Sequence, residues 1–259
     1  MRTALHSPRP ATPVPIALPP ARHRRKEARP QELLDAALDL FVEKGFAATR
    51  SEEVAARAGV SKGTLYLYYP SKEELLKAVI RNSISSEIAE GHDIVRAFEG
   101  SSAELLAHLM REWWRRIGET KASGICKIIV SEVRNFPDIA RFYLEEVVEP
   151  AERMLAGVVE RGIERGEFRP VPVRETVNAM MAPMLFLMLH KHSIGACQSM
   201  DKRIDPLRQI EVQLDLLLHG LQRHSTDSPP ATSPSAQPRD SGALRTEHHG
   251  GDQAPGERS

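Results

Sequence analysis

Hydroxyl and ammonium groups are concentrated between residues 61 and 72 of this 259-residue chain. Three of its four tyrosines, Tyr66, Tyr68 and Tyr69, lie there within four positions. Tyrosine suits a rigid, partly apolar surface that also forms hydrogen bonds with a large partner. Hydroxyl groups of Ser, Thr and Tyr can donate to phosphate oxygens, and a lysine ammonium neutralises phosphate charge. The chemistry that this combination favours is contact with a nucleic-acid backbone.

Two short helices joined by a tight turn must position these groups. Val54, Ala55 and Ala58 are spaced to face inward from the first helix, and Leu65 is the inward residue of the second. Gly59 supplies the backbone freedom that the turn requires. In helix-turn-helix proteins the second helix lies in the major groove of DNA. The pattern also leaves open two amphipathic helices of an ordinary helical protein, with tyrosines at the edge of its core.

The overall charge favours no partner, because 35 Lys and Arg balance 35 Asp and Glu. Residues 30–72 hold six acidic and five basic side chains, so the helix-turn-helix unit is not a basic module. Residues 21–29 carry five Lys and Arg against one Glu. We therefore expect non-specific affinity for DNA to come from this basic segment and from dimerisation.

Helical periodicity and the lack of any convincing strand predict an all-α fold. The termini, 1–26 and 222–259, are rich in proline or poor in bulky apolar residues and are expected to be disordered. Between them we expect a helix-turn-helix DNA-binding domain (27–87, the head) and a helical domain (88–221, the body). The expected helices span about 30–44, 51–58, 61–68, 71–90, 102–117, 121–135, 137–166, 173–192 and 206–221.

Three of these helices carry signals at specific residues. Pro30 is expected at the first helical position, where its missing N–H is tolerated. Thr49 and Glu52 have the spacing of a capping box at the start of the second helix. Pro150 is expected to kink the long helix 137–166.

The stretch "LDAALDLFVEKGFAATRSEEVAARAGVSKGTLYLYYPSKEELLKAVI" (34–80) resembles the DNA-binding region of the tetracycline-repressor (TetR-like) family. The matching elements are "A-x-x-L-F-x-x-x-G-F", "T-x-x-x-x-V-A-x-x-A-G-V-S-x-G-T-L-Y" and "Y-P-S-K-E-E-L". The resemblance implies an N-terminal three-helix head and a helical body that binds a ligand and dimerises through its last two helices. Leu67 stands where that family often has an aromatic residue, so any base contact there would be apolar. Carried over by position, the DNA contacts would come from Thr49, Arg50, Ser51, Ser61, Lys62, Thr64, Tyr66, Tyr68 and Lys72.

Large, adaptable apolar side chains in the body suggest a ligand pocket. Met side chains accommodate varied shapes, and pockets are commonly lined by such residues with a few polar groups. The alternative is plain core or dimer-interface packing. The expected ligand-binding residues are His108, Trp113, Trp114, Met180, Met184 and Met188.

The last helix carries a leucine stripe that is expected to pair with a second copy of the chain. The stripe consists of Leu214, Leu217, Leu218 and Leu221.

Other groups of residues give weaker functional signals. His190, His192 and Cys197 do not have convincing metal-ligand spacing, and we expect neither a metal site nor a cofactor. Cys126, in "ICKIIV", reads as a buried apolar residue. No Walker or dinucleotide-binding motif is present.

Together these patterns predict a sequence-specific DNA-binding transcriptional regulator. It is expected to be a cytoplasmic homodimeric repressor that leaves a palindromic operator when a small apolar or amphipathic ligand binds, with no membrane partner. The competing interpretations are an enzyme built on a helical body, for which no catalytic set is visible, and a DNA-binding protein without a small ligand.

Overall fold

The computed structural model describes residues 21–132 and 134–222. In these ranges the chain forms helices and turns, and the only β-type pairing is an isolated bridge between Phe168 and Gln222. The predicted all-α fold is confirmed. The α-helices are α1 (Ala21–Lys44), α2 (Ser51–Arg57), α3 (Lys62–Tyr68), α4 (Lys72–Ile80), α5 (Ser86–Ala97), α6 (Ser102–Trp113), α7 (Gly124–Glu132), α8 (Pro137–Tyr143), α9 (Glu149–Glu164), α10 (Val173–Lys191) and α11 (Pro206–Leu221).

Helix α1 is longer than the sequence suggested. It begins at Ala21, so the basic segment is helical from that residue on, and Pro30 lies inside the helix. The expectation of a disordered arm reaching residue 26 is therefore wrong for residues 21–26, while residues 1–20 lie outside the described part. Ala, Arg, Lys and Glu are strong helix formers, and they dominate this segment.

A single continuous helix joins the head to the body. Helix α4 runs into a π-helical turn, η1 (Arg81–Ser85), and then into α5, so helical backbone extends from Lys72 to Ala97. The domain boundary expected at residue 87 falls inside α5 and marks no break in the chain. Two further π-helical turns extend α6 and separate α8 from α9; they are η2 (Trp114–Gly118) and η4 (Leu144–Val148).

The turn η4 explains how Pro150 is accommodated. Proline has no N–H to donate to the fourth residue before it, and its ring clashes with that residue's carbonyl in a regular helix. Here Pro150 stands in the first turn of α9, directly after η4. The long helix expected over 137–166 is therefore interrupted by a wider turn.

A second internal proline, Pro183, is compensated from a neighbouring helix. Its missing N–H leaves the Ala179 carbonyl of α10 without its usual helical donor. The buried side chain of Gln213, on α11, donates from Nε2 to the Met180 carbonyl at 2.9 Å and to the Ala179 carbonyl at 3.5 Å. This contact ties α11 to the middle of α10.

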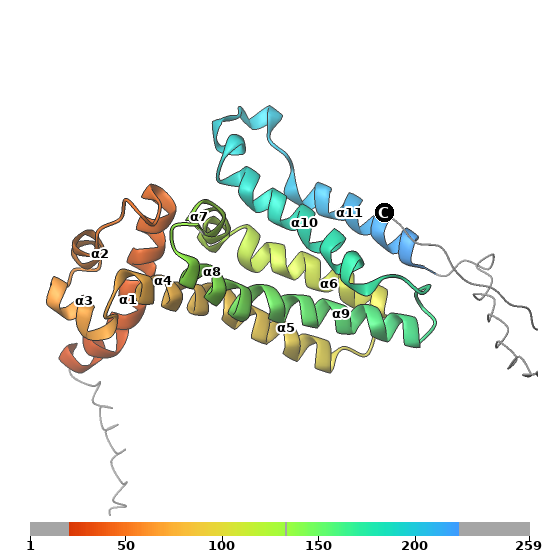
Figure 1. The fold of residues 1–259 in the computed structure, drawn as a ribbon, viewed down its shortest axis with the longest axis horizontal. Coiled ribbons are helices and arrows are strands. Elements are labelled where there is room, and N and C mark those ends of the chain that lie inside the picture. Colours follow the sequence, from red (N-terminus) through yellow and green to blue (C-terminus); the bar gives the residue numbers. More distant parts are fainter. Residues whose placement is uncertain (1–20, 133, 223–259) are drawn as a thin grey trace, which may run out of the picture. The chain divides into compact units, whose positions relative to one another are not determined.

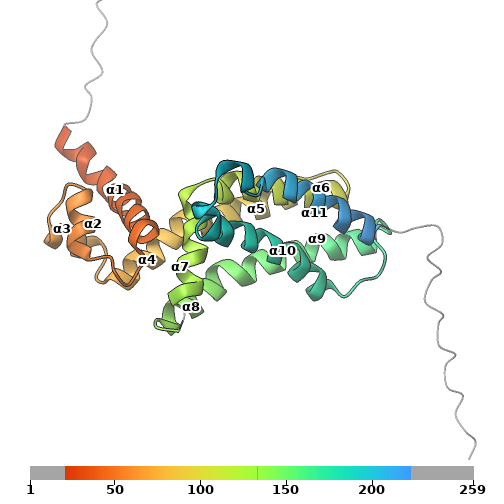
Figure 2. The same cartoon turned by 90° about the horizontal axis from the view of Figure 1, so that it is seen from above.

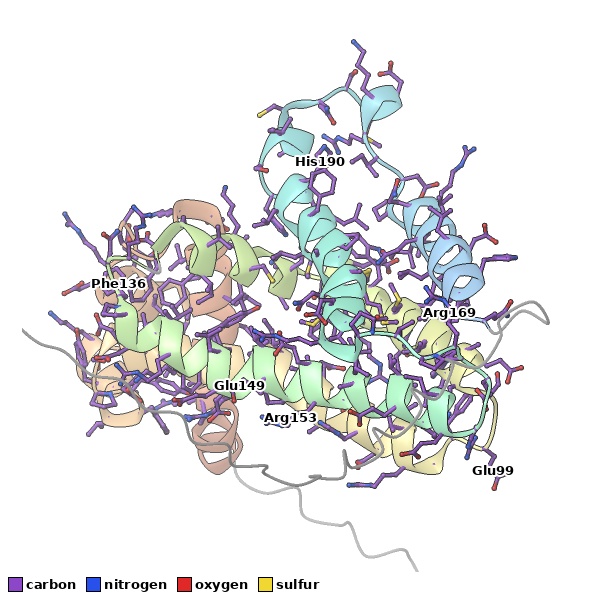
Figure 3. All side chains as sticks on the ribbon, turned by 45° about the vertical axis from the view of Figure 1, so that its right-hand side comes forward. Glu99, Phe136, Glu149, Arg153, Arg169 and His190 are labelled. Atoms are coloured by element: carbon purple, nitrogen blue, oxygen red, sulfur yellow. The ribbon has the colours of Figure 1, made fainter. Side chains whose placement is uncertain are left out.

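Helices α5, α6, α9, α10 and α11 pack lengthwise beside one another to form the body (Figures 1 and 2). One buried cluster extends from the head into the body, and a second lies between α6, α9, α10 and α11. Phe136, labelled in Figure 3, contacts the head edge-on through Phe46, with ring centroids 4.8 Å apart. Among the described residues no helix has the length and apolar character needed to cross a membrane.

Candidate DNA-binding surface and ligand cavity

The α2–α3 unit has the predicted helix-turn-helix geometry. Gly59 adopts a left-handed backbone conformation with φ of 67°, and the Val60 N–H donates to the Ala55 carbonyl at 2.9 Å. Ala55 and Leu65 are buried where the two helices meet. A residue with a Cβ would be strained at Gly59, which fixes glycine as the residue that closes the turn.

Helix α3 exposes one side to solvent. Its first turn is capped by Ser61, whose Oγ accepts from the Thr64 N–H at 3.1 Å. Further along, Tyr66 is 39% exposed and Leu67 is 84% exposed. Leu67 and Tyr66 together give this side of α3 an apolar surface next to a hydroxyl group. Leu67 was absent from the set of nine expected contacts, although the family resemblance had already suggested that a base contact at its position would be apolar.

Most basic side chains of the head are paired with carboxylates. Lys44 contacts Glu53 at 2.7 Å, and Arg57 contacts Glu43 at 2.8 Å. Lys62, an expected DNA contact, contacts Glu52, and this contact raises the pKa of its ammonium. Arg50 is exposed and forms no ion pair with any described residue. The head therefore offers DNA little unpaired positive charge, as the sequence predicted.

Two of the expected DNA contacts are buried. Thr49 is 1% exposed, and its hydroxyl donates to the carbonyls of Gly45 at 2.7 Å and Leu40 at 3.1 Å. Ser51 is 7% exposed. The Thr49 hydroxyl is thus engaged inside the head, whereas the Ser51 hydroxyl forms no hydrogen bond with any described residue. We therefore leave Thr49 out of the proposed DNA contacts and give Ser51 less weight than the exposed residues of α3. Tyr68 and Thr64 are half-buried, and Tyr68 packs against the core.

The capping box at the start of α2 lies one residue later than expected. Arg50, not Thr49, is the N-cap residue, and its backbone N–H donates to the Glu53 carboxylate at 3.2 Å. The pairing expected between Thr49 and Glu52 is wrong because the Thr49 hydroxyl is bonded to backbone carbonyls inside the head.

Lys72 holds the loop before α2 instead of pointing freely outward. Its ammonium donates to the carbonyls of Phe46 at 2.9 Å, Thr49 at 3.1 Å and Ala47 at 3.3 Å, and it lies 4.5 Å from the centre of the Phe46 ring. An ammonium has three protons, and three carbonyls accept them here. From these contacts we infer that Lys72 positions the head instead of making the expected phosphate contact.

We predict that Lys72→Met lowers the free energy of unfolding by about 1–3 kcal/mol, because charge-assisted hydrogen bonds to three carbonyls are lost. The slope of log affinity against log salt should stay unchanged, since no phosphate contact is removed. Urea unfolding and salt-dependent DNA titration measure both quantities. Lys77→Met is the control on the same helix, and its surface pair with Glu74 should change stability by less than about 1 kcal/mol. A salt slope lowered by about one in Lys72→Met alone would return Lys72 to the DNA surface.

The body encloses a cavity of about 400 Å³ between α5, α6, α9 and α10. Met180, Met184 and Met188 line it from α10, and Trp113 lines it from α6, as the sequence suggested. The lining also includes Tyr143, whose hydroxyl lies 3.5 Å from the Cys126 sulfur. Burial raises the pKa of the Cys126 thiol, which keeps it protonated. A cavity of this size and apolar lining is typical of a small-molecule site.

Two expected ligand-binding residues do not face this cavity. Trp114 is 2% exposed and borders a different hollow of about 370 Å³, beside the segment that joins α10 to α11. His108 is exposed and stacks on Phe98, with ring centroids 6.2 Å apart. Leu109 and Met110 line the cavity from the same helix. The helical turn therefore directs His108 to the opposite side.

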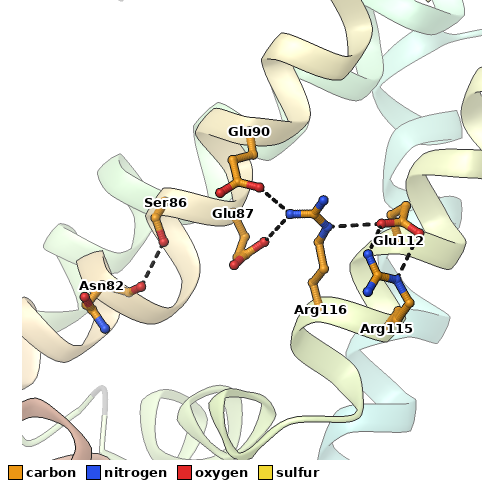
Figure 4. Close-up of polar contacts among 7 residues, drawn as sticks. All are labelled: Asn82, Ser86, Glu87, Glu90, Glu112, Arg115 and Arg116. Carbon is orange, nitrogen blue, oxygen red and sulfur yellow. Dashed lines mark hydrogen bonds and ion pairs between the residues drawn. The ribbon is translucent and has the colours of Figure 1, made fainter. Parts of the chain in front are cut away.

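One end of the cavity carries charge. Glu87, Glu112 and Arg116 are part of its lining, and the Arg116 guanidinium bridges α5 and α6 (Figure 4). Its Nη1 contacts Glu87 at 3.0 Å and also contacts Glu90, while its Nε contacts Glu112 at 3.1 Å. Hydrogen bonds from Arg115 and Arg116 lower the pKa of Glu112 to about 2. Sequence inspection missed this cluster, because its residues come from two helices.

Half of the expected dimerisation stripe is buried within the chain, while Leu217 and Leu218 are half-buried. Leu214 and Leu221 are 3% and 4% exposed and pack inside their own protomer. The exposed apolar side chains of α11 are instead Leu207, Val212 and Leu216. On α10, the exposed apolar side chains are Leu185 and Phe186, and Phe186 packs against His190 with ring centroids 5.8 Å apart (His190 is labelled in Figure 3).

The sequence pattern of the bacterial regulatory proteins of the tetR family matches residues 33–79, and that of the tetracyclin repressor-like C-terminal domain matches residues 99–196. The transcriptional repressor KstR2 of Rhodococcus jostii is 32% identical over 145 residues, covering 56% of this chain and 70% of KstR2.

Solved structures share the fold. A transcriptional regulator from Saccharomonospora viridis in complex with choline has a TM-score of 0.64 at 18% identity, covering 77% of this chain and 100% of that one. The regulator FadR of Bacillus subtilis in complex with stearoyl-CoA has a TM-score of 0.56 at 21% identity, covering 73% and 98%. The matched sequence patterns, the similarity to KstR2 and the helix-turn-helix geometry agree: this chain belongs to the tetR family of bacterial regulatory proteins and is a DNA-binding transcriptional regulator.

Proposed function

We propose that this regulator is a homodimeric cytoplasmic repressor that binds a palindromic operator and releases it when a small amphipathic molecule enters the body cavity. The observation that carries the proposal is the continuous helix α4–η1–α5. Leu76 and Ile80 of this helix are buried in the core that reaches the head, and Ile88 and Gly91 line the cavity. A ligand that displaces α5 would therefore move α4 and the head with it. We assign DNA binding to residues 27–87, and ligand sensing and dimerisation to residues 88–221.

The proposed DNA contacts are those that remain exposed or partly exposed in the head. Phosphate contacts come from hydroxyl and basic groups, and base contacts from the middle of α3. Leu67 is well suited to an apolar contact with a thymine methyl group. The proposed set is Arg50, Ser61, Lys62, Thr64, Tyr66 and Leu67, with Tyr68 at its edge.

The relatives support small-molecule control. Stearoyl-CoA and choline occupy the two solved regulators compared above, which have the same fold. In this chain the ligand would bind the state whose recognition helices no longer match successive major grooves, about 34 Å apart. Release then follows from preferential binding to that state. By linkage, operator DNA must weaken ligand affinity by the same factor by which the ligand weakens DNA affinity.

The function is tested by recovering genomic DNA fragments with the purified protein and footprinting the enriched site. Protection of one palindrome, lost on addition of a compound that also raises the melting temperature, supports the proposal. A compound that binds DNA-bound and free protein equally well would contradict the coupling, because release requires different affinities for the two states.

We predict that Leu67→Ala weakens operator binding by about 5- to 30-fold, the effect of losing one good base contact of about 1–2 kcal/mol. Affinity for random DNA should change little, because phosphate contacts are untouched. Fluorescence anisotropy with operator and scrambled duplexes measures both. Leu144→Ala is the control, since Leu144 is also exposed, at 51%, but lies in the body. Equal affinities for wild type and Leu67→Ala would remove Leu67 from the interface.

A further inference from the structure

The cavity is apolar along most of its length, and its charge is confined to one end. Among the described residues that line it, the only ionised groups are Glu87, Glu112 and Arg116. The other polar groups of the lining, including Tyr143 and Asn178, are uncharged. A ligand that fills the cavity therefore meets methionine and aliphatic side chains over its length and charged groups at one point. The charged end of the cavity therefore determines which polar group of a ligand can bind.

Carboxylates outnumber guanidinium groups at this end. Among the described residues, only Arg115 and Arg116 form ion pairs with Glu87, Glu90 and Glu112, so three carboxylates face two guanidinium groups and the formal charge of the cluster is −1. Glu87, Glu112 and Arg116 line the cavity, and Glu90 and Arg115 lie just outside the lining. Glu87 and Glu90 both contact Arg116 Nη1, so one guanidinium nitrogen serves two carboxylates (Figure 4). These two carboxylates retain acceptor capacity for a further donor.

The Arg116 guanidinium is therefore not free to receive an anion. A ligand carboxylate or phosphate would have to approach through like charges, which disfavours its ionised form. Glu87, Glu112 and Arg116 are each between about one quarter and one third exposed, so water screens this repulsion only in part. A cationic nitrogen group would instead be attracted by the carboxylates that share Arg116, and an uncharged end would be attracted less strongly.

We propose that the ligand of this cavity is an amphiphile with a cationic nitrogen end, held by Glu87 of the lining with the carboxylate of Glu90 just outside it, and an apolar part among the methionines of α10. The proposal rests on the proposed function, whose ligand site it specifies. It also explains how ligand binding could be coupled to the head. A cation on Glu87 competes with Arg116, the side chain that links α6 to α5, and α5 is continuous with α4.

The test uses three probes with similar nine- or ten-carbon chains and different polar ends: decyltrimethylammonium, decanol and decanoate, each below its micelle concentration. Trp113 lines the cavity, so tryptophan fluorescence reports binding, and the melting temperature gives a second measure. We expect decyltrimethylammonium to bind at least about tenfold more tightly than decanoate, a difference of about 1.4 kcal/mol. Operator release should follow the same order.

A charge-matched pair of variants locates the effect. Glu87→Gln with Glu90→Gln should reduce the preference for the cation over decanoate at least about tenfold. Glu160→Gln with Glu164→Gln removes the same charge from the exposed side of α9 and should leave the preference unchanged. Equal losses in both variants would show that general attraction to the protein, not this site, selects the cation, and would overturn the proposal.

Two other outcomes separate this inference from the proposed function. If decanoate binds as tightly as the cation and releases DNA, the ligand class is wrong while the repressor function stands. If none of the three probes binds and the operator is still recognised, the cavity is not an amphiphile site, and both the ligand class and ligand control through this cavity fail.

Discussion

Val212→Glu combined with Leu216→Glu is expected to convert the protein into a monomer and to weaken operator binding by about 100- to 10,000-fold. The two side chains are 48% and 69% exposed and lie one turn apart on α11, on a different side from the buried Leu214. Two carboxylates placed on this surface would have to be desolvated against their copies in a dimer. A monomer engages one half-site and loses the effective-concentration gain of the second head.

Sedimentation velocity and operator titration measure the two effects. Val130→Glu with Leu144→Glu is the matched control, because these side chains are 55% and 51% exposed but belong to α7 and η4, not to α10 or α11. Leu214→Glu is unsuitable as a test, since it would place a charge in the core of the protomer and unfold it. If the variant Val212→Glu with Leu216→Glu remains dimeric, the dimer interface lies elsewhere on the protein.

Ala151→Trp is expected to produce a repressor that holds its operator but no longer responds to ligand. Ala151 lines the cavity from α9 and is half-buried, so an indole at this position would occupy space that the ligand needs. We expect ligand affinity to fall by about 100-fold or more, equivalent to about 3 kcal/mol. Overpacking could lower the free energy of unfolding by about 1–3 kcal/mol, with no direct effect on DNA contacts.

Thermal shift with decyltrimethylammonium and operator binding with and without it measure the outcome. Ala89→Trp is the control, because Ala89 is exposed on α5 and adds the same ring outside the cavity. If Ala151→Trp still released DNA at the same probe concentration as wild type, the cavity would not be where the ligand acts.

The sequence was sufficient to predict the local geometry of the head. Leu65 and Gly59 were predicted correctly, because helical spacing and the need for a left-handed turn are properties of neighbouring residues. The predicted N-cap of α2 was wrong by one residue, because Arg50 and not Thr49 occupies that position. Thr49 can bond its hydroxyl to a carbonyl as well as to an N–H, and the carbonyls of Leu40 and Gly45 come from the preceding helix and its end.

The incorrect predictions of which side chains face a partner or the cavity have a different origin. A leucine stripe shows that one face of α11 is covered, but Leu214 and Leu221 satisfy that requirement within the protomer as well as a second copy would. His108 was grouped with Trp113 by composition, although the helix directs them differently. The charged end of the cavity requires α5 and α6 to meet, and no pattern within either helix contains that information.

The π-helical turn η1 bears on how this protein tolerates insertions and deletions. A π-helical turn is wider than an α-helical one because its hydrogen bonds close one residue later. Loss of one residue within Arg81–Ser85 could therefore close the turn into regular α-helix while α4 and α5 keep their relative orientation. The same deletion elsewhere between Lys72 and Ala97 would rotate everything beyond it by about 100° about the helix axis. Length variation between head and body should therefore concentrate in these five residues.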